Sequence, residues 1–134
     1  MASIVSAVRP LRVLLVEDEV LISEWVAQTL NEQGFAVQTA SNAAEALEHL
    51  KRTPVDVLFT DVNLLGEMDG IELARRAREL TPGLTIVYAS GGMNALDSAL
   101  RVPGSLFVAK PYDPAFIGPL LANAAKAEAD HVLA

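Results

Sequence analysis

The chain contains no cysteine, which excludes disulfide bonds, thiolate metal ligands and a cysteine nucleophile. It has no run of about 18 apolar residues, the length that a helix needs to cross a bilayer. Residues 1–10 also lack the basic start and apolar stretch of a signal peptide. Positive charge is scarce: 10 Lys and Arg stand against 17 Asp and Glu, and the net charge of −7 disfavours binding to nucleic acid or anionic membranes. These absences predict a cytoplasmic protein with neither a membrane nor a nucleic acid as partner.

What the chain does contain is sufficient for one globular domain. Its 134 residues are 51% apolar and 20% charged, which is typical of a single folded unit. Short apolar runs alternate five times with amphipathic stretches of helical period. The expected strands cover residues 12–16, 35–39, 55–60, 84–88 and 105–109. The expected helices cover residues 19–33, 43–50, 70–80, 93–100 and 113–127. This alternation predicts a parallel sheet with helices on both faces.

Charged residues follow three of these predicted strands. Glu17 and Asp18 come directly after the first, Asp61 after the third, and Lys110 after the fifth. In open parallel sheets the carboxyl ends of the strands form one rim, and ligands bind outside it. Unit charges about 4 Å apart repel by roughly 4 kcal/mol at an effective dielectric near 20. Three carboxylates on one rim therefore need compensation, and a divalent cation is the expected group.

Four motifs, each at the end of a predicted strand, resemble those of a known family. They are Leu14-Leu15-Val16-Glu17-Asp18, Phe59-Thr60-Asp61-Val62-Asn63, Val87-Tyr88-Ala89-Ser90-Gly91 and Phe107-Val108-Ala109-Lys110-Pro111. On these residues the chain resembles the receiver domain of bacterial two-component response regulators. The resemblance implies a flavodoxin-like (βα)5 three-layer sandwich with five parallel strands in the order 2-1-3-4-5. It divides the chain into an N-terminal extension (1–10), the receiver domain (11–127) and a frayed C-terminal tail (128–134).

The resemblance also implies which residues would carry the chemistry. Asp61 matches the phospho-acceptor, which takes a phosphoryl group from the phosphohistidine of a sensor histidine kinase or histidine phosphotransfer protein. Glu17 and Asp18 match the acidic pair that holds Mg²⁺ together with Asp61 and the backbone carbonyl of Asn63. Magnesium is therefore the implied cofactor.

Three further positions match residues that respond to the phosphoryl group. Ser90 matches the hydroxyl residue that hydrogen-bonds a phosphoryl oxygen, and Lys110 matches the lysine that pairs with the phosphate. Phe107 matches the aromatic switch residue, which turns inward when the hydroxyl residue moves. The bond before Pro111 matches a peptide bond that is cis in the family.

Two departures from the family pattern lie beside the predicted site. Leu65 stands four residues beyond Asp61, where the family often has proline. The loop from Asp61 to the Asp69-Gly70 pair is also one residue longer than the commonest form.

The predicted function is a single-domain response regulator: a signalling protein, not an enzyme with a separate substrate, that catalyses its own phosphorylation and dephosphorylation. Its partners would be the phosphodonor and an unidentified downstream protein, and its length leaves no room for a DNA-binding domain. One alternative is a degenerate receiver acting as a constitutive protein-interaction module. Another is a haloacid-dehalogenase-like phosphohydrolase, which requires Asp-x-Asp where this chain has Glu17-Asp18-Glu19. A third is a flavodoxin-like nucleotide or flavin binder, whose phosphate these same carboxylates would repel.

Overall fold

The computed structural model describes residues 9–91 and 101–133, with side chains to residue 127, and it confirms the predicted parallel sheet. The five strands are β1 (Arg12–Val16), β2 (Ala36–Ala40), β3 (Val57–Asp61), β4 (Thr85–Ser90) and β5 (Leu106–Ala109). All neighbouring strands are parallel, and the order is β2-β1-β3-β4-β5, as the family resemblance implied. The described helices are α2 (Val20–Glu32), α3 (Ala43–Arg52), α4 (Gly70–Leu80) and α5 (Pro114–Leu133).

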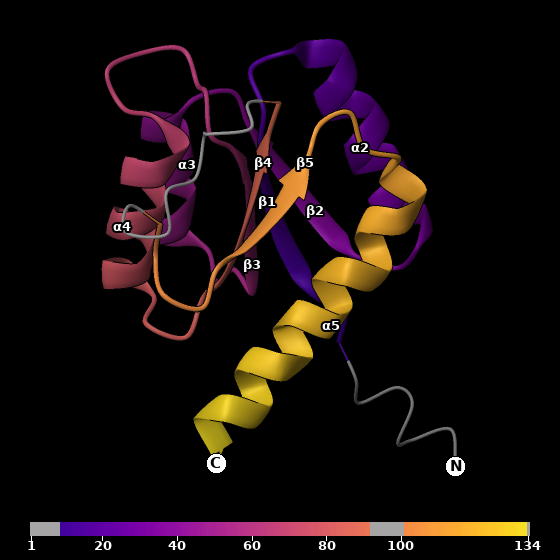
Figure 1. Ribbon diagram of the computed structural model, residues 1–134, viewed down its shortest axis with the longest axis vertical. Helices are drawn as coiled ribbons and strands as arrows, with labels where there is room; N and C mark the ends of the chain where they lie inside the picture. The colour runs from indigo at the N-terminus through magenta and orange to yellow at the C-terminus, as the bar shows by residue number, and fades with distance from the viewer. Residues whose placement is uncertain (1–8, 92–100, 134) are drawn as a thin grey trace.

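The helices cover the sheet on both faces, which gives the three layers of a flavodoxin-like fold (Figure 1). One apolar cluster joins the sheet to α3 and α4, and a second joins it to α2 and α5. Strand β1 contributes to both, because successive side chains of a strand point to opposite faces. Leu14 and Val16 pack in the first cluster, whereas Val13 and Leu15 pack in the second. This double burial explains why β1 is an unbroken apolar run.

The carboxyl ends of β4 and α5 lie beyond the ends expected from the sequence. Strand β4 includes Ser90, two residues beyond the predicted end at residue 88. Helix α5 continues to Leu133, beyond the predicted end at residue 127, and the fraying expected of residues 128–134 stays a prediction. Alanine is the strongest helix former, and the alanine-rich sequence after residue 121 favours this continuation. The predicted helix at residues 93–100 lies outside the described residues. None of the described helices is long and apolar enough to cross a membrane.

Helix α5 contains a proline, and a neighbouring helix supplies the hydrogen bond that this proline cannot make. Pro119 has no N–H, so the carbonyl of Ala115, four residues earlier, lacks its regular helical donor. The side chain of Gln33, at the end of α2, donates from Nε2 to that carbonyl oxygen at 3.0 Å. Gly118 leaves room for it, because a Cβ there would collide with the Gln33 amide. The two helices on this face are thus joined by a polar contact as well as by apolar packing.

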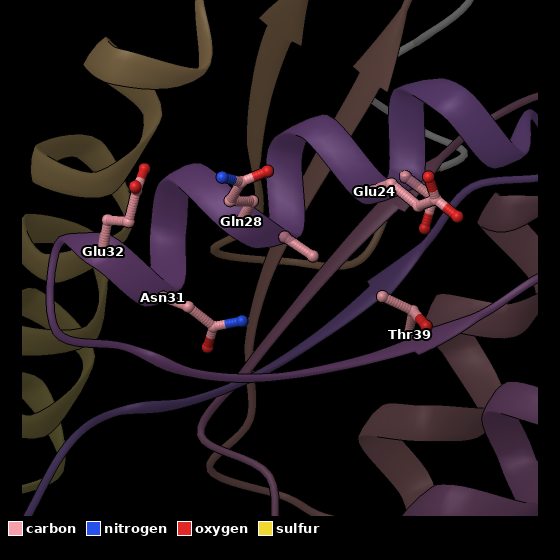
Figure 2. Close-up of a pocket in the computed structure, with 7 residues that line it drawn as sticks. Glu24, Gln28, Asn31, Glu32 and Thr39 are labelled. Atoms are coloured by element: carbon pink, nitrogen blue, oxygen red, sulfur yellow. The ribbon is translucent and has the colours of Figure 1, made fainter.

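The edge strand β2 borders a polar groove of about 640 Å³ that it shares with α2. Figure 2 shows residues of α2 that line this groove, among them Glu24, Gln28 and Asn31, and Thr39 of β2, which borders it on the other side. The Asn31 side chain accepts a hydrogen bond from the backbone N–H of Val37 at 3.2 Å, which occupies one donor of the sheet edge. None of the carboxylates at the carboxyl end of the sheet lines this groove.

At the opposite end of the sheet, an ion pair fixes where β1 and β3 begin. The Asp56 carboxylate accepts hydrogen bonds from the backbone N–H of Arg12 at 2.8 Å, and from Nε and Nη2 of the Arg12 guanidinium, both at 3.1 Å. Burial alone would raise the pKa of Asp56, but the hydrogen bonds and charge of Arg12, together with the charge of Arg9, hold that pKa below its ordinary value.

We expect Asp56→Asn to destabilise the protein by about 1 kcal/mol at pH 7, a modest figure because water partly screens the pair. A lowered folded-state pKa contributes stability above the ordinary aspartate pKa, and that contribution is lost as the pH falls through the folded-state value. The difference between variant and wild type should therefore shrink below about pH 4. Urea unfolding at pH 7 and pH 3 measures this difference in the free energy of unfolding. The control Glu48→Gln breaks an exposed ion pair with Lys51 and should leave the free energy of unfolding almost unchanged at either pH. An equal loss of stability for Asp56→Asn at both pH values would contradict an ionic origin of the effect.

Candidate functional site

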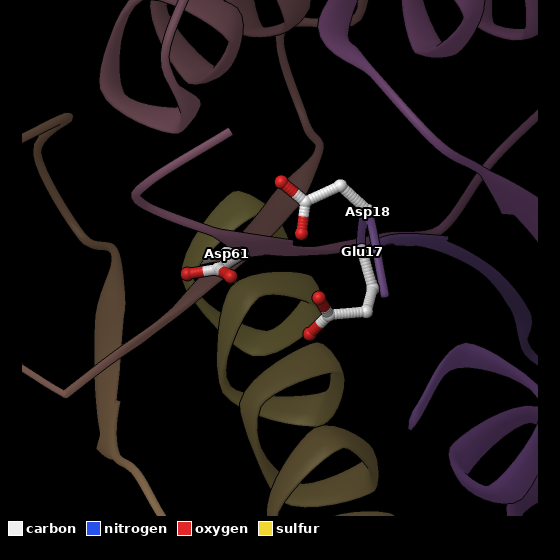
Figure 3. Close-up of side chains that lie close together, drawn as sticks. All are labelled: Glu17, Asp18 and Asp61. Carbon is white, nitrogen blue, oxygen red and sulfur yellow. The ribbon is translucent and has the colours of Figure 1, made fainter. Parts of the chain in front are cut away.

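The carboxyl ends of β1 and β3 bring three carboxylates together. Glu17 and Asp18 follow β1 directly, and Asp61 is the last residue of β3. One oxygen of each lies within 4.8 Å of the others, and the three groups converge in Figure 3. Glu17 is only 4% exposed and Asp61 only 8%. Carboxylate oxygens in such a group are the ligands that Mg²⁺ prefers, so the residues present fit this ion.

Lys110, directly after β5, supplies positive charge to the same place. Its Nζ donates to Oδ2 of Asp61 at 2.7 Å and lies 3.4 Å from Oε1 of Glu17. The Lys110 side chain is 25% exposed, so the ammonium is partly withdrawn from water. A single cation contacting two of three carboxylates leaves net negative charge in the cluster.

Burial raises the pKa of Glu17, because the charged carboxylate loses water, and the negative charge of Asp61 acts in the same direction. The backbone N–H of Glu19 and the ammonium of Lys110 oppose that rise without cancelling it. Burial would lower the pKa of Lys110, but the hydrogen bond to Asp61 and the charges of Asp61 and Glu17 raise it above its ordinary value. Lys110 is therefore held in its charged form beside Asp61.

The backbone around Asp61 is closely constrained. The N–H of Val62 donates to the carbonyl of Ala89 at 3.0 Å, and the N–H of Gly70 donates to the carbonyl of Val62 at 2.8 Å. Asn63 turns its N–H toward Oδ1 of Asp61 at 3.3 Å. These contacts extend the hold of the sheet past the end of β3 and limit how far Asp61 can move.

The other predicted residues lie around this cluster at different depths. Ser90 is buried at the end of β4, and its carbonyl accepts the N–H of Lys110 at 2.9 Å. Asn63 is exposed in the loop after β3. Phe107 lies in β5 opposite Tyr88 and is 37% exposed, so its ring is not part of the apolar core in this conformation. The peptide bond between Lys110 and Pro111 is cis.

An apolar cavity of about 410 Å³ adjoins Lys110. Its lining includes Ile22, Trp25 and Val26 of α2, and Tyr112 after the cis peptide bond. The Tyr112 ring packs against Phe59 of β3 with the ring centroids 5.5 Å apart. Burial, assisted by the nearby charge of Glu17, raises the pKa of Tyr112 to about 12. Tyr112 is therefore a neutral, largely apolar wall beside the charged cluster.

Sequence reasoning missed three groups that contact or adjoin the cluster. Gly70 was interpreted only as the start of a helix, yet a Cβ there would collide with the carbonyl oxygen of Asp61. The backbone N–H of Leu65 donates to Oδ2 of Asp18 at 3.3 Å. Tyr112 was not singled out at all. The Asp69-Gly70 pair held a signal, since a glycine at the first position of a helix is a poor helix former and so suggests a steric requirement.

Comparison with known proteins gives a consistent result. The sequence matches the model of the response regulator receiver domain over residues 13–119. The response regulator receiver protein CpdR of Brucella abortus (strain 2308) is 41% identical over 80 residues, which cover 60% of this chain and 66% of that protein. The uncharacterized transcriptional regulatory protein YbdJ of Bacillus subtilis (strain 168) is 31% identical over 105 residues, which cover 77% of this chain and 45% of that protein. The chain thus spans less than two thirds of the length of these curated relatives.

Solved structures agree with the sequence comparison. A response regulator receiver protein from Sinorhizobium medicae WSM419 superposes with a TM-score of 0.82 at 32% identity, covering 89% of this chain and 97% of that one. The chemotaxis response regulator CheY4 of Vibrio cholerae superposes with a TM-score of 0.75 at 25% identity, covering 86% of this chain and 98% of that one. The strand order, the acidic cluster at the rim and these matches agree, and the chain belongs to the response regulator receiver domain family.

Proposed function

We propose that this chain accepts a phosphoryl group on Asp61 from the phosphohistidine of a histidine kinase or a histidine phosphotransfer protein. Receiver domains accept phosphoryl groups in this way in two-component signalling, and they bind Mg²⁺ at an acidic pocket. The observation that carries the proposal is the position of the Asp61 carboxylate, which contacts Lys110 and lies within 4.8 Å of oxygens of Glu17 and Asp18.

The transfer is a displacement at phosphorus. A carboxylate oxygen of Asp61 forms the new O–P bond, while the N–P bond of the phosphohistidine breaks and its electron pair returns to the imidazole. Lys110, charged and already beside Asp61, stabilises the negative charge on the transferring oxygens. Glu17, Asp18, Asp61 and the carbonyl of Asn63 would hold Mg²⁺, which when bound offsets the repulsion between the carboxylate and the anionic phosphoryl group.

Two further residues, Ser90 and Phe107, would respond to phosphorylation and so change the surface of the protein near β5. Ser90 is buried at the end of β4 and would hydrogen-bond a phosphoryl oxygen through its hydroxyl. Phe107 is 37% exposed on the neighbouring strand and would turn inward when Ser90 moves. Such a movement is a packing change between two discrete states, which a downstream protein can distinguish.

The proposal is tested with acetyl phosphate as a small phosphodonor, in magnesium and again in excess EDTA. Intact-mass measurement should show the gain of one phosphoryl group in the wild type with magnesium, and no gain in Asp61→Asn. The matched control is Asp69→Asn, because asparagine keeps the oxygen that caps α4 and Asp69 lies outside the cluster. EDTA should suppress the gain.

The possible outcomes separate the alternatives. A mass gain that persists in Asp61→Asn would place the acceptor at another residue. A wild type that gains no mass, although its phosphodonor is intact and magnesium is present, would favour the degenerate receiver that acts only as an interaction module.

A further inference from the structure

The loop between β3 and α4 reaches back to the acidic cluster through its backbone. The N–H of Leu65 donates to Oδ2 of Asp18 at 3.3 Å, a contact between residues 47 positions apart. We propose that this N–H is a positioning group: it orients the Asp18 carboxylate and thereby sets the affinity of the cluster for a divalent cation. The inference rests on the proposed function, because the cation is the one that the acceptor site would hold.

Asp18 differs from the other two carboxylates in what holds it. Glu17 and Asp61 both contact the ammonium of Lys110 and are buried. Asp18 is half-buried, and within the described part of the chain Leu65 is the only donor to its carboxylate. Without this bond, the Asp18 side chain would be free to rotate away from the cluster. With Oδ2 engaged, the other oxygen of Asp18 remains available as a ligand.

The loop is built so that this N–H is held in place. At its start, Val62 donates to Ala89 of β4, and at its end Gly70 donates to Val62, so the start is anchored to the sheet and the end is anchored to the start. Gly66, directly after Leu65, has a φ of +112°, a conformation that glycine adopts without strain and that turns the chain at this point. The ends and the turn together direct one backbone N–H toward Asp18.

The side chain of Leu65 takes no part in this contact. It is 74% exposed, so the position makes no packing demand on the kind of residue that occupies it. It does demand an N–H, which every residue except proline supplies. Hydrogen bonds that orient a metal ligand contribute substantially to metal binding, and losing one lowers metal affinity by about 10–100-fold.

The direct test removes the N–H without changing any side chain. Incorporating the α-hydroxy acid analogue of leucine at position 65 replaces the amide by an ester and keeps the side chain. An ester at position 67, made with the α-hydroxy acid analogue of glutamate, is the matched control, because the N–H of Glu67 has no hydrogen-bond partner among the described residues and the carbonyl that this ester alters, that of Gly66, is not a proposed ligand. Leu65→Ala is the second control, since it removes the side chain and keeps the N–H. Isothermal titration with Mg²⁺ alone gives the dissociation constant of each protein.

We expect the ester at position 65 to raise the Kd for Mg²⁺ about tenfold, at the lower end of the range for such supporting contacts. The ester at position 67 and Leu65→Ala should match the wild type. Leu65→Pro, which also lacks the N–H, should shift the Kd in the same direction as the ester. Since the N–H acts through Asp18, the ester at position 65 should cause no further loss of affinity in an Asp18→Ala background, which offers no oxygen to that N–H.

Each outcome bears on a different claim. An unchanged Kd with the ester at position 65, in a protein whose wild type binds Mg²⁺, overturns the positioning role and leaves the proposed function standing. A lower melting temperature without metal, accompanied by an unchanged Kd, identifies a purely structural bond and also overturns the inference. A wild type that does not bind Mg²⁺ overturns both the inference and the metal requirement of the proposed function.

Discussion

Replacing Gly70 by alanine is expected to destabilise the protein by about 2–3 kcal/mol and to displace the Asp61 backbone. The new Cβ would collide with the carbonyl oxygen of Asp61, lie 2.9 Å from its carbonyl carbon and lie 3.0 Å from the Cα of Val62. All three neighbours are backbone atoms, so no side chain can rotate to make room. The strand end that carries Asp61 must move, or the start of α4 must move away from it.

Urea unfolding measures the stability of Gly70→Ala, and the rate of mass gain from acetyl phosphate reports on Asp61. Both should fall together, because the same displacement causes both losses. Gly83→Ala is the matched control: a Cβ at position 83 has no atom within 4 Å, and this variant should unfold and react as the wild type does. A fully stable Gly70→Ala with normal phosphorylation would show that the contact between α4 and β3 is looser than described.

Replacing Lys110 by methionine is expected to lower the free energy of unfolding by about 2–3 kcal/mol at neutral pH. The ammonium is the cation that contacts both buried carboxylates, at 2.7 Å from Asp61 and 3.4 Å from Glu17. Removing one partner of a fully buried ion pair costs about 3–5 kcal/mol, because the other charge is left uncompensated. The expected loss here is smaller, since Lys110 keeps a quarter of its side chain exposed.

The loss should depend on pH in a defined direction. The pKa of Glu17 is already raised by burial and by Asp61, and losing the ammonium would raise it further. A carboxyl group with a raised folded-state pKa binds its proton more tightly when folded, so stability falls as the pH rises from the ordinary glutamate pKa through the folded-state value. The free energy of unfolding of Lys110→Met, measured by urea unfolding, should therefore be closest to the wild-type value near pH 4.5 and furthest from it near pH 8.

The control for this experiment is Lys51→Met, which breaks an exposed ion pair with Glu48 at 3.6 Å. Such pairs contribute little, so this variant should stay within about 0.5 kcal/mol of the wild type at every pH. A deficit for Lys110→Met that does not change with pH would indicate lost packing of the lysine stem as its source.

The sequence alone predicted the parallel sheet and the charged residues of the rim, because both depend on local patterns. Unbroken apolar runs marked the central strands, and the acidic residues stood directly after Val16 and Thr60. The order of the strands did not follow from these patterns; it came from the family resemblance and is confirmed by the observed pairing. Periodicity records which face of an element is buried, but it carries no information about which strand lies beside which.

The contacts that support the site could not be predicted for a related reason. The N–H that reaches Asp18 belongs to the backbone of Leu65, and a backbone group looks alike at every position in a sequence. The need for glycine at position 70 arises from Asp61, nine positions earlier, and the Ala115 carbonyl near Pro119 finds its donor in Gln33, on another helix. These are tertiary relationships, and they exist only once the elements have packed.

The cavity beside Lys110 has a practical consequence. Trp25, the single tryptophan of the chain, lines that cavity together with Lys110 and is 57% exposed. Indole emission responds to the charge and hydration of its surroundings, and here all of it comes from a side chain that lines the same cavity as Lys110, which contacts Asp61. If Asp61 is phosphorylated as proposed, we expect the tryptophan fluorescence of unlabelled protein to change on addition of acetyl phosphate and magnesium, and not to change in Asp61→Asn.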